Sequence, residues 1–200
     1  MKRVLIAVLV TAVMVVSAQV FAAEYGSMKV GLKGGLNISG FHGDDAEGWD
    51  SRIGGCVGAL AEFPINNMLS FAPELLYTMK GAKADIGDEE VTWKLSYIEI
   101  PMLFKFAFPT GGAVNPMLLV GPEVAFKTSS KLAGGDVEVE FDEAKSTDVG
   151  FIVGGGIGFP FGTHSGSVEV RYDLGLTNMV DVEDADVKND VISFLFGISF

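Results

Sequence analysis

The chain has very few of the residues on which many metal centres, disulfide scaffolds and hydrolytic sites depend. It contains one cysteine, Cys56, and two histidines, His42 and His164. One cysteine cannot build a disulfide framework or a cysteine-based metal centre, so Cys56 is expected to be a small buried hydrophobic residue. Basic residues are scarce as well, since 14 Lys and Arg face 26 Asp and Glu and give a formal net charge of −12. Such an excess of acid disfavours binding to nucleic acid.

Long apolar runs are missing from all but the start of the chain. Residues 1–22 combine the basic Lys2 and Arg3 with an apolar stretch and a small-residue cleavage site at Ala22. This pattern predicts a signal peptide that directs secretion through the inner membrane and is then cleaved. No later stretch reaches 18 uncharged apolar residues, so the remainder is predicted to contain no transmembrane helix. We therefore expect one further domain, residues 23–200.

The last ten residues, VISFLFGISF, repeat apolar side chains at every second position. These side chains are Ile192, Phe194, Phe196, Ile198 and Phe200. Alternate residues of a strand point to opposite faces, so the pattern predicts a strand with one apolar face that ends in aromatic residues. Membrane-spanning β-barrels are built from such strands. We interpret Phe196, Ile198 and Phe200 as a C-terminal assembly signal for the barrel-assembly machinery during insertion.

Turn-forming residues divide the rest of the sequence into segments of strand length. The predicted segments are 28–40, 52–63, 68–81, 91–108, 114–128, 148–160, 166–178 and 191–200. Short connections alternate with longer acidic ones, which are 41–51, 82–90, 129–147 and 179–190. Short turns on one side and long loops on the other are typical of outer-membrane barrels, with both termini on the periplasmic side. The predicted fold is all-β, an eight-stranded antiparallel up-and-down transmembrane β-barrel.

Within each of these segments the charged residues occupy alternate positions, on the strand face opposite to the most apolar row. In the seventh segment Glu169, Arg171 and Asp173 alternate with apolar side chains. A Lys or Arg that faces lipid at the bilayer midplane costs about 2–4 kcal/mol, so the charged rows are expected inside. Eight strands leave an interior just wide enough for side chains, and we expect ion pairs to fill the lumen. The predicted interior network comprises Glu74, Glu99, Lys105, Glu123, Glu169, Arg171 and Asp173.

The acidic connections are the main candidates for a ligand site outside the strands. Clustered carboxylates are suitable oxygen ligands for divalent cations. The candidate cation-binding residues are Asp44, Asp45, Asp181, Glu183, Asp184 and Asp186. No connection has the D-x-D-x-D-G spacing of an ordered calcium loop, so solvated extracellular loops are the favoured interpretation. We predict no metal site and no cofactor.

Two further patterns superficially resemble functional motifs. Ser39, His42 and Asp44 form a local Ser–His–Asp grouping, but three residues on one connection match triad geometry poorly. The glycine-rich run at 154–158 is followed by Pro160 and does not open the helix that a phosphate-binding loop requires. We therefore expect neither an enzyme nor a phosphate site.

Two sequence segments, YIEIP at 97–101 and RYDLGL at 171–176, resemble the PorT-like outer-membrane β-barrel family. Weaker similarity runs in the same order across essentially all of residues 23–200. The resemblance implies a single eight-stranded barrel in a bacterial outer membrane. One branch of the family is associated with protein secretion across that membrane, and the family supplies no catalytic residues.

The sequence thus predicts an integral outer-membrane protein with a structural or surface-binding role, in contact with outer-membrane lipids. One alternative is a subunit of a protein-secretion complex or another envelope complex, with protein partners in the envelope. A minor alternative is a soluble periplasmic ligand-binding barrel of the lipocalin type. That barrel requires an apolar cavity and a polar exterior, which is the opposite of the observed parity.

Overall fold

The computed structural model describes residues 28–43, 46, 48–86, 89–134, 137–140, 145–178 and 187–200. The predicted signal peptide lies outside these residues. The described chain forms antiparallel strands, in keeping with its alternating pattern of apolar and polar residues. The strands are β1 (Lys29–His42), β2 (Asp50–Pro64), β3 (Leu69–Ile86), β4 (Glu89–Ala107), β5 (Asn115–Gly134), β6 (Val137–Glu140), β7 (Thr147–Phe161), β8 (His164–Gly175) and β9 (Lys188–Ser199).

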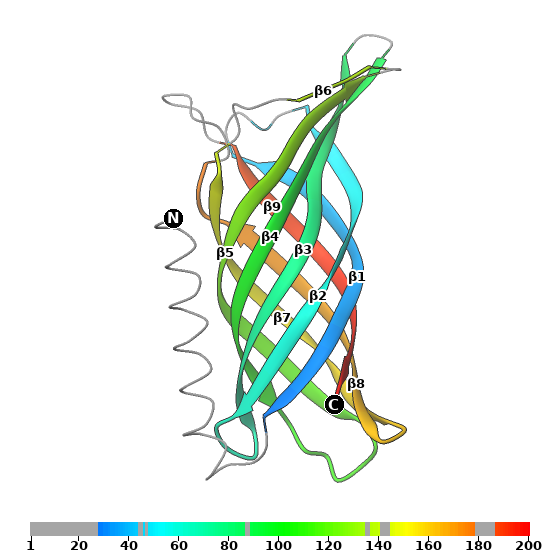
Figure 1. Ribbon diagram of the computed structural model, residues 1–200, viewed down its shortest axis with the longest axis vertical. Helices are drawn as coiled ribbons and strands as arrows, with labels where there is room; N and C mark the ends of the chain where they lie inside the picture. The colour runs from blue at the N-terminus through cyan, green and yellow to red at the C-terminus, as the bar shows by residue number, and fades with distance from the viewer. Residues whose placement is uncertain are drawn as a thin grey trace.

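Eight of these strands close into a barrel, as the sequence predicts. Each long strand pairs with its neighbour in the chain, and β9 returns to pair with β1 from Gly31↔Ser199 to His42↔Lys188. β4 also pairs with β5, and β6 is a short addition to the end of β5. The strands are strongly inclined, and the chain ends at the same end of the barrel as the short turns (Figure 1).

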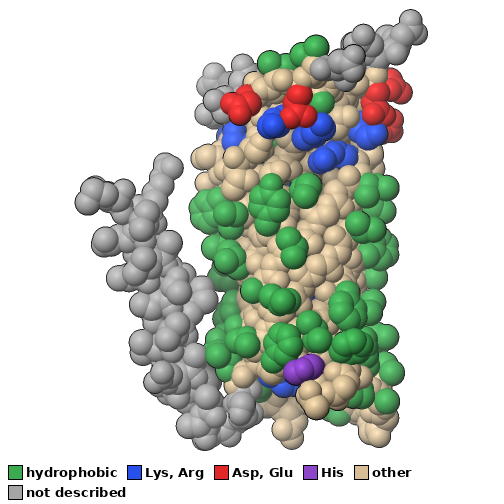
Figure 2. Space-filling model, turned by 45° about the vertical axis from the view of Figure 1, so that its right-hand side comes forward, with side chains coloured by type: hydrophobic (Ala, Val, Ile, Leu, Met, Phe, Trp, Pro, Cys, Tyr) green, Lys and Arg blue, Asp and Glu red, His purple; other side chains and the backbone are tan. Residues whose placement is uncertain are grey.

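The barrel has an apolar outside and a polar inside. Leu36 and Phe194, outward-facing residues of neighbouring strands, are 60% and 49% exposed, whereas the inward-facing Asn37 is fully buried. Apolar side chains cover the middle of the barrel, and charged groups gather at the long-loop end (Figure 2). This arrangement is the reverse of a soluble domain, and it confirms the lipid-facing row predicted along β9.

Several strands are longer than the sequence predicts. β3 continues to Ile86 and β4 begins at Glu89, so the predicted 82–90 loop is mostly a hairpin extension beyond the barrel. The predicted 129–147 loop also contains the end of β5, and β6 pairs with it. Charged and polar residues mark both segments, and this composition suggested loops. The strands nevertheless stay paired, from Lys83↔Thr92 to Ile86↔Glu89 between β3 and β4 and from Val91↔Gly134 between β4 and β5.

No helix among the described residues is long and apolar enough to cross a membrane.

Gly35 shows why small residues recur along the wall. A Cβ atom added to Gly35 would lie 2.0 Å from the carbonyl oxygen of Phe194 on the neighbouring strand. Backbone cannot yield as a flexible side chain can, so Gly35→Ala is expected to destabilise the barrel by roughly 1–3 kcal/mol. Urea unfolding in detergent micelles checks this value. Gly55→Ala is the control, because the nearest atom to its added Cβ is 3.6 Å away; equal losses in the two variants would contradict the close-approach argument.

Candidate functional site

The lumen holds two clusters of buried charged side chains. The first cluster, here called the balanced cluster, contains Lys33 of β1, Glu74 of β3, and Glu169 and Arg171 of β8. Two bases face two acids, so the cluster is neutral when all four groups are ionised. Each of these side chains is nearly inaccessible to solvent. A charge left unpaired among them would therefore destabilise the fold.

Arg171 makes the most extensive contacts in the balanced cluster. Its Nη1 and Nη2 atoms donate to the two carboxylate oxygens of Glu74 at 2.8 and 2.7 Å, a bidentate geometry. Its Nη2 and Nε atoms also donate to Oε2 of Glu169, at 2.6 and 3.0 Å. Lys33 Nζ donates to Oε1 of Glu74 at 2.7 Å and to Oε2 of Glu169 at 2.8 Å. The cluster therefore links β1, β3 and β8 across the lumen.

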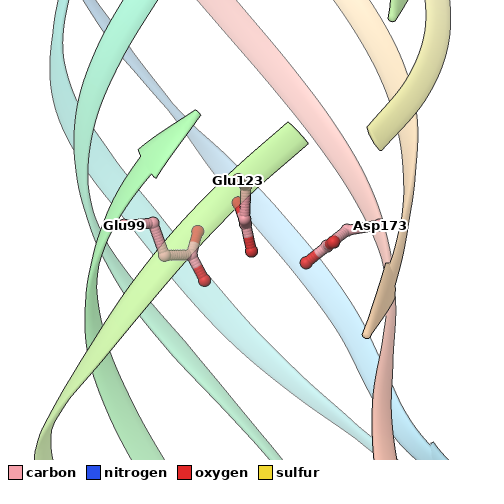
Figure 3. Close-up of side chains that lie close together, drawn as sticks. All are labelled: Glu99, Glu123 and Asp173. Atoms are coloured by element: carbon pink, nitrogen blue, oxygen red, sulfur yellow. The ribbon is translucent and has the colours of Figure 1, made fainter. Parts of the chain in front are cut away.

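The second cluster, here called the acidic cluster, has one base for three acids. Lys80 Nζ lies 2.7 Å from Oε1 of Glu99, 3.2 Å from Oε1 of Glu123 and 2.7 Å from Oδ2 of Asp173. The three carboxylates converge from β4, β5 and β8 (Figure 3). Thr78 Oγ1 also donates to Oε2 of Glu99 at 2.7 Å.

The carboxylates of the acidic cluster have the spacing of a metal site. One oxygen from each of Glu99, Glu123 and Asp173 lies within 4.8 Å of the others. The Lys80 ammonium contacts all three, so it occupies the position that a cation would take. A metal ion here would have to displace this ammonium group, and the cluster is therefore best described as an internal ion-pair site.

A small cavity separates the two clusters. Its volume is about 20 Å³, enough for about one water molecule, and its wall includes Asn37, Cys56 and residues of both clusters. Asn37 Nδ2 is buried and donates to no described group. Cys56 is buried, as the sequence predicts, and lies on this lumen wall.

The two ends of the lumen differ. A cavity of about 470 Å³ lies at the short-turn end, lined by Lys29, Ser167 and other polar residues, and the balanced cluster borders it. In the same region Lys105 Nζ donates to Oε2 of Glu62 at 2.6 Å. Toward the other end, Trp93, Leu95 and Tyr97 form a buried apolar layer. From the short-turn end to the long-loop end, the lumen therefore contains an open cavity, then the charged clusters and then the buried apolar layer.

The predicted interior residues all lie in the lumen, but they do not form one network. Glu74, Glu169 and Arg171 meet in the balanced cluster, and Glu99, Glu123 and Asp173 meet in the acidic cluster. Lys105 is separate and pairs with Glu62. Contact between Glu99 and Arg171 is absent from the described interactions.

The structure adds a third polar group around Asp148, the first residue of the predicted segment 148–160, which the predicted interior network does not include. Asp148 lies on β7 and is buried. Asn189 Nδ2 donates to its Oδ2 at 2.8 Å, and Thr177 Oγ1 donates to its Oδ1. Its even-numbered position, shared with the inward-facing Ile152, is the signal that would have found it.

The remaining candidate residues lie on the inner wall, on the outer surface or outside the described chain. The candidate cation ligands Asp44, Asp45, Asp181, Glu183, Asp184 and Asp186 are outside the described residues. Ser39 is buried and donates its hydroxyl to the carbonyl of Gly81 at 2.8 Å. In the C-terminal segment Phe196 and Phe200 are exposed on the outer surface, 45% and 57%, and Phe200 packs edge-on against His164.

A family model for the outer membrane protein beta-barrel domain matches residues 17–181. The chain belongs to this family. Membership places the protein in the outer membrane. The match is to the outer-membrane β-barrel family as a whole and not to its PorT-like branch in particular. No curated protein matches the sequence.

Three solved structures of bacterial proteins each align with 86% of this chain. Neisserial surface protein A has a TM-score of 0.53 and 18% identity, covering 86% of this chain and 95% of that one. The attachment invasion locus protein Ail of Yersinia pestis has a TM-score of 0.43 and 13% identity, covering 86% and 98%. The N-terminal barrel domain of Pseudomonas aeruginosa OprF has a TM-score of 0.41 and 11% identity, covering 86% and 97%. The first of these supports the eight-stranded architecture.

Proposed function

We propose that this outer-membrane protein is a closed barrel with a structural or surface-binding role, and that it is neither a general pore nor an enzyme. The observation that carries the proposal is the filled lumen. The balanced cluster, the acidic cluster and the apolar layer around Trp93 occupy successive levels, and the cavity between the two clusters measures only about 20 Å³. This filling supports a lumen without a continuous water-filled path through the part that the structure describes.

Conductance of the purified protein in a planar lipid bilayer tests this proposal. We expect no steady ion current from the folded barrel, because its buried charges are held by several partners each. Leu95→Gly with Tyr97→Gly, which removes two large side chains from the apolar layer, is a comparison variant that replaces no charged residue of either cluster. A stable current through the unaltered protein would overturn the proposal.

The surface role is proposed for the part of the barrel that projects beyond the membrane. β3, β4 and β5 extend past the barrel as a paired sheet with β6 at its edge. The long connections at this end carry many of the 26 acidic residues, which favours solvated loops. The PorT-like relationship, a role for Phe196, Ile198 and Phe200 in engaging the assembly machinery, and contact with outer-membrane lipids belong to the same proposal.

A further inference from the structure

The cavity at the short-turn end of the lumen, here called the short-turn cavity, is large enough for a small organic ligand. Its volume is about 470 Å³, within the range of ligand pockets in proteins. Residues of all eight barrel strands line it, from Lys29 of β1 to Ser199 of β9. It differs in this respect from the cavity of about 20 Å³ between the two charged clusters, which holds about one water molecule.

The charged groups around the short-turn cavity leave one positive charge unpaired. The balanced cluster, which borders the cavity, is neutral when its four groups are ionised. Lys105 and Glu62 neutralise each other through a contact of 2.6 Å. Lys29 is the register partner of Glu62, but among the described residues its ammonium has no ion-pair or hydrogen-bond partner. The cavity therefore presents a free cation in a chain whose formal net charge is −12.

Two serine hydroxyls lie beside Lys29 on the cavity wall. Ser165 of β8 pairs with Ser199 of β9, which in turn pairs with Gly31 of β1. A Cβ atom added to Gly31 would lie 2.9 Å from Oγ of Ser199, so this hydroxyl lies against the inner face of a residue that has no side chain. Lys29 is the next inward-facing residue along β1, about 7 Å away, and an extended lysine side chain is of about that length.

The two hydroxyls are free to donate to a ligand. Within the part of the chain that the structure describes, neither Ser165 nor Ser199 makes a side-chain hydrogen bond. An ammonium group and two hydroxyl donors on one wall form a donor set suited to a carboxylate, because hydrogen bonds to a charged acceptor are stronger than neutral ones. The remaining polar lining includes Ser70, Ser167 and Asn115, whose side chains both donate and accept.

We propose that the short-turn cavity binds a small hydroxylated carboxylate, of the chemical class of the sugar acids. Lys29, Ser165 and Ser199 hold the carboxylate, and the hydroxyl and amide groups on the rest of the wall hydrogen-bond to the hydroxyl groups of the ligand. The sequence predicts that this end of the barrel faces the periplasm, so the ligand is a periplasmic solute. The inference goes beyond the structural or surface-binding role and does not depend on whether the lumen conducts ions.

NMR titration of the isotope-labelled protein in detergent micelles with D-galacturonate tests the site. We expect the amide signals of Gly31, Ser165 and Ser199 to shift. D-galactose, which has a hydroxymethyl group in place of the carboxylate, should bind at least about tenfold more weakly. Lys29→Gln should weaken galacturonate binding by roughly the same factor, whereas Lys29→Arg, which keeps the charge, should retain it.

Lys94→Gln is the matched control, because Lys94 is an exposed lysine of β4 that does not line the cavity. Its affinity for galacturonate should equal that of the unaltered protein. The proposal fails if galacturonate shifts no signal from the cavity wall, or if a folded Lys29→Gln barrel, identified by its band on unheated detergent gels, binds galacturonate unchanged. Acetate binding as tightly as galacturonate would overturn the assignment of a hydroxylated ligand. None of these results bears on the conductance measurement, so failure of this inference is distinguishable from failure of the proposed function.

Discussion

Arg171→Leu is expected to lower the free energy of unfolding of the barrel by roughly 3–5 kcal/mol. The substitution removes five donors from a buried site and leaves Glu74 and Glu169 to share Lys33. Two carboxylates with one ammonium leave a net negative charge in a water-poor lumen, and no other described base contacts them. Urea titration of the folded protein in detergent micelles, followed by the band shift on unheated gels, measures the loss.

The control for Arg171→Leu is Val170→Leu on the same strand. Val170 faces outward and is exposed, so a larger apolar side chain there meets lipid or detergent rather than the packed lumen. Arg171→Lys adds a second comparison, because it keeps the charge but loses the bidentate contact with Glu74. Unfolding of Arg171→Leu at the same urea concentration as the unaltered protein would refute the role of the balanced cluster.

The faces of the strands could be predicted from the sequence because their period is fixed at two residues. Phe194 and Phe196 lie on the outer surface as the alternation predicts, and Glu169 and Arg171 lie inside. One face of each strand must meet lipid, so even a short alternating segment determines which rows are inside. The number of barrel strands follows from the same pattern and from the turn residues.

The partners inside the lumen could not be predicted in the same way. The alternation predicts that Glu99 and Arg171 point inward. Their levels along the barrel axis, however, depend on the strand tilt and on the register of every pair of strands between them. Glu99 consequently meets Lys80, while Arg171 meets Glu74. The ends of β3 and β4 were missed for a different reason. Their polar residues are compatible with either a loop or a solvated hairpin, and only pairing between the strands distinguishes the two.

In the acidic cluster, removing the base is expected to lower the free energy of unfolding, whereas removing one acid is expected to leave it unchanged or raise it. Lys80→Met leaves the buried carboxylates of Glu99, Glu123 and Asp173 without their shared cation. We expect a loss of at least about 3–5 kcal/mol in the free energy of unfolding, or failure to fold, since no described base replaces the ammonium. Urea unfolding in micelles measures the loss, and refolding yield into lipid vesicles gives a readout if the variant is too unstable to titrate.

Glu123→Gln supplies the matched test, because the acidic cluster has more acids than its single base can neutralise. Of the three acids, Glu123 makes the longest contact with Lys80, 3.2 Å. Replacing it with an amide of similar size removes one negative charge. The contacts of Glu99 and Asp173 with Lys80, both 2.7 Å, remain. We expect Glu123→Gln to be neutral or stabilising, whereas Glu74→Gln in the balanced cluster should destabilise by leaving two bases with one acid. Combining Glu123→Gln with Lys80→Met should recover part of the loss. Equal destabilisation by Glu123→Gln and Glu74→Gln would show that hydrogen bonding, and not the local charge balance, determines the stability of both clusters.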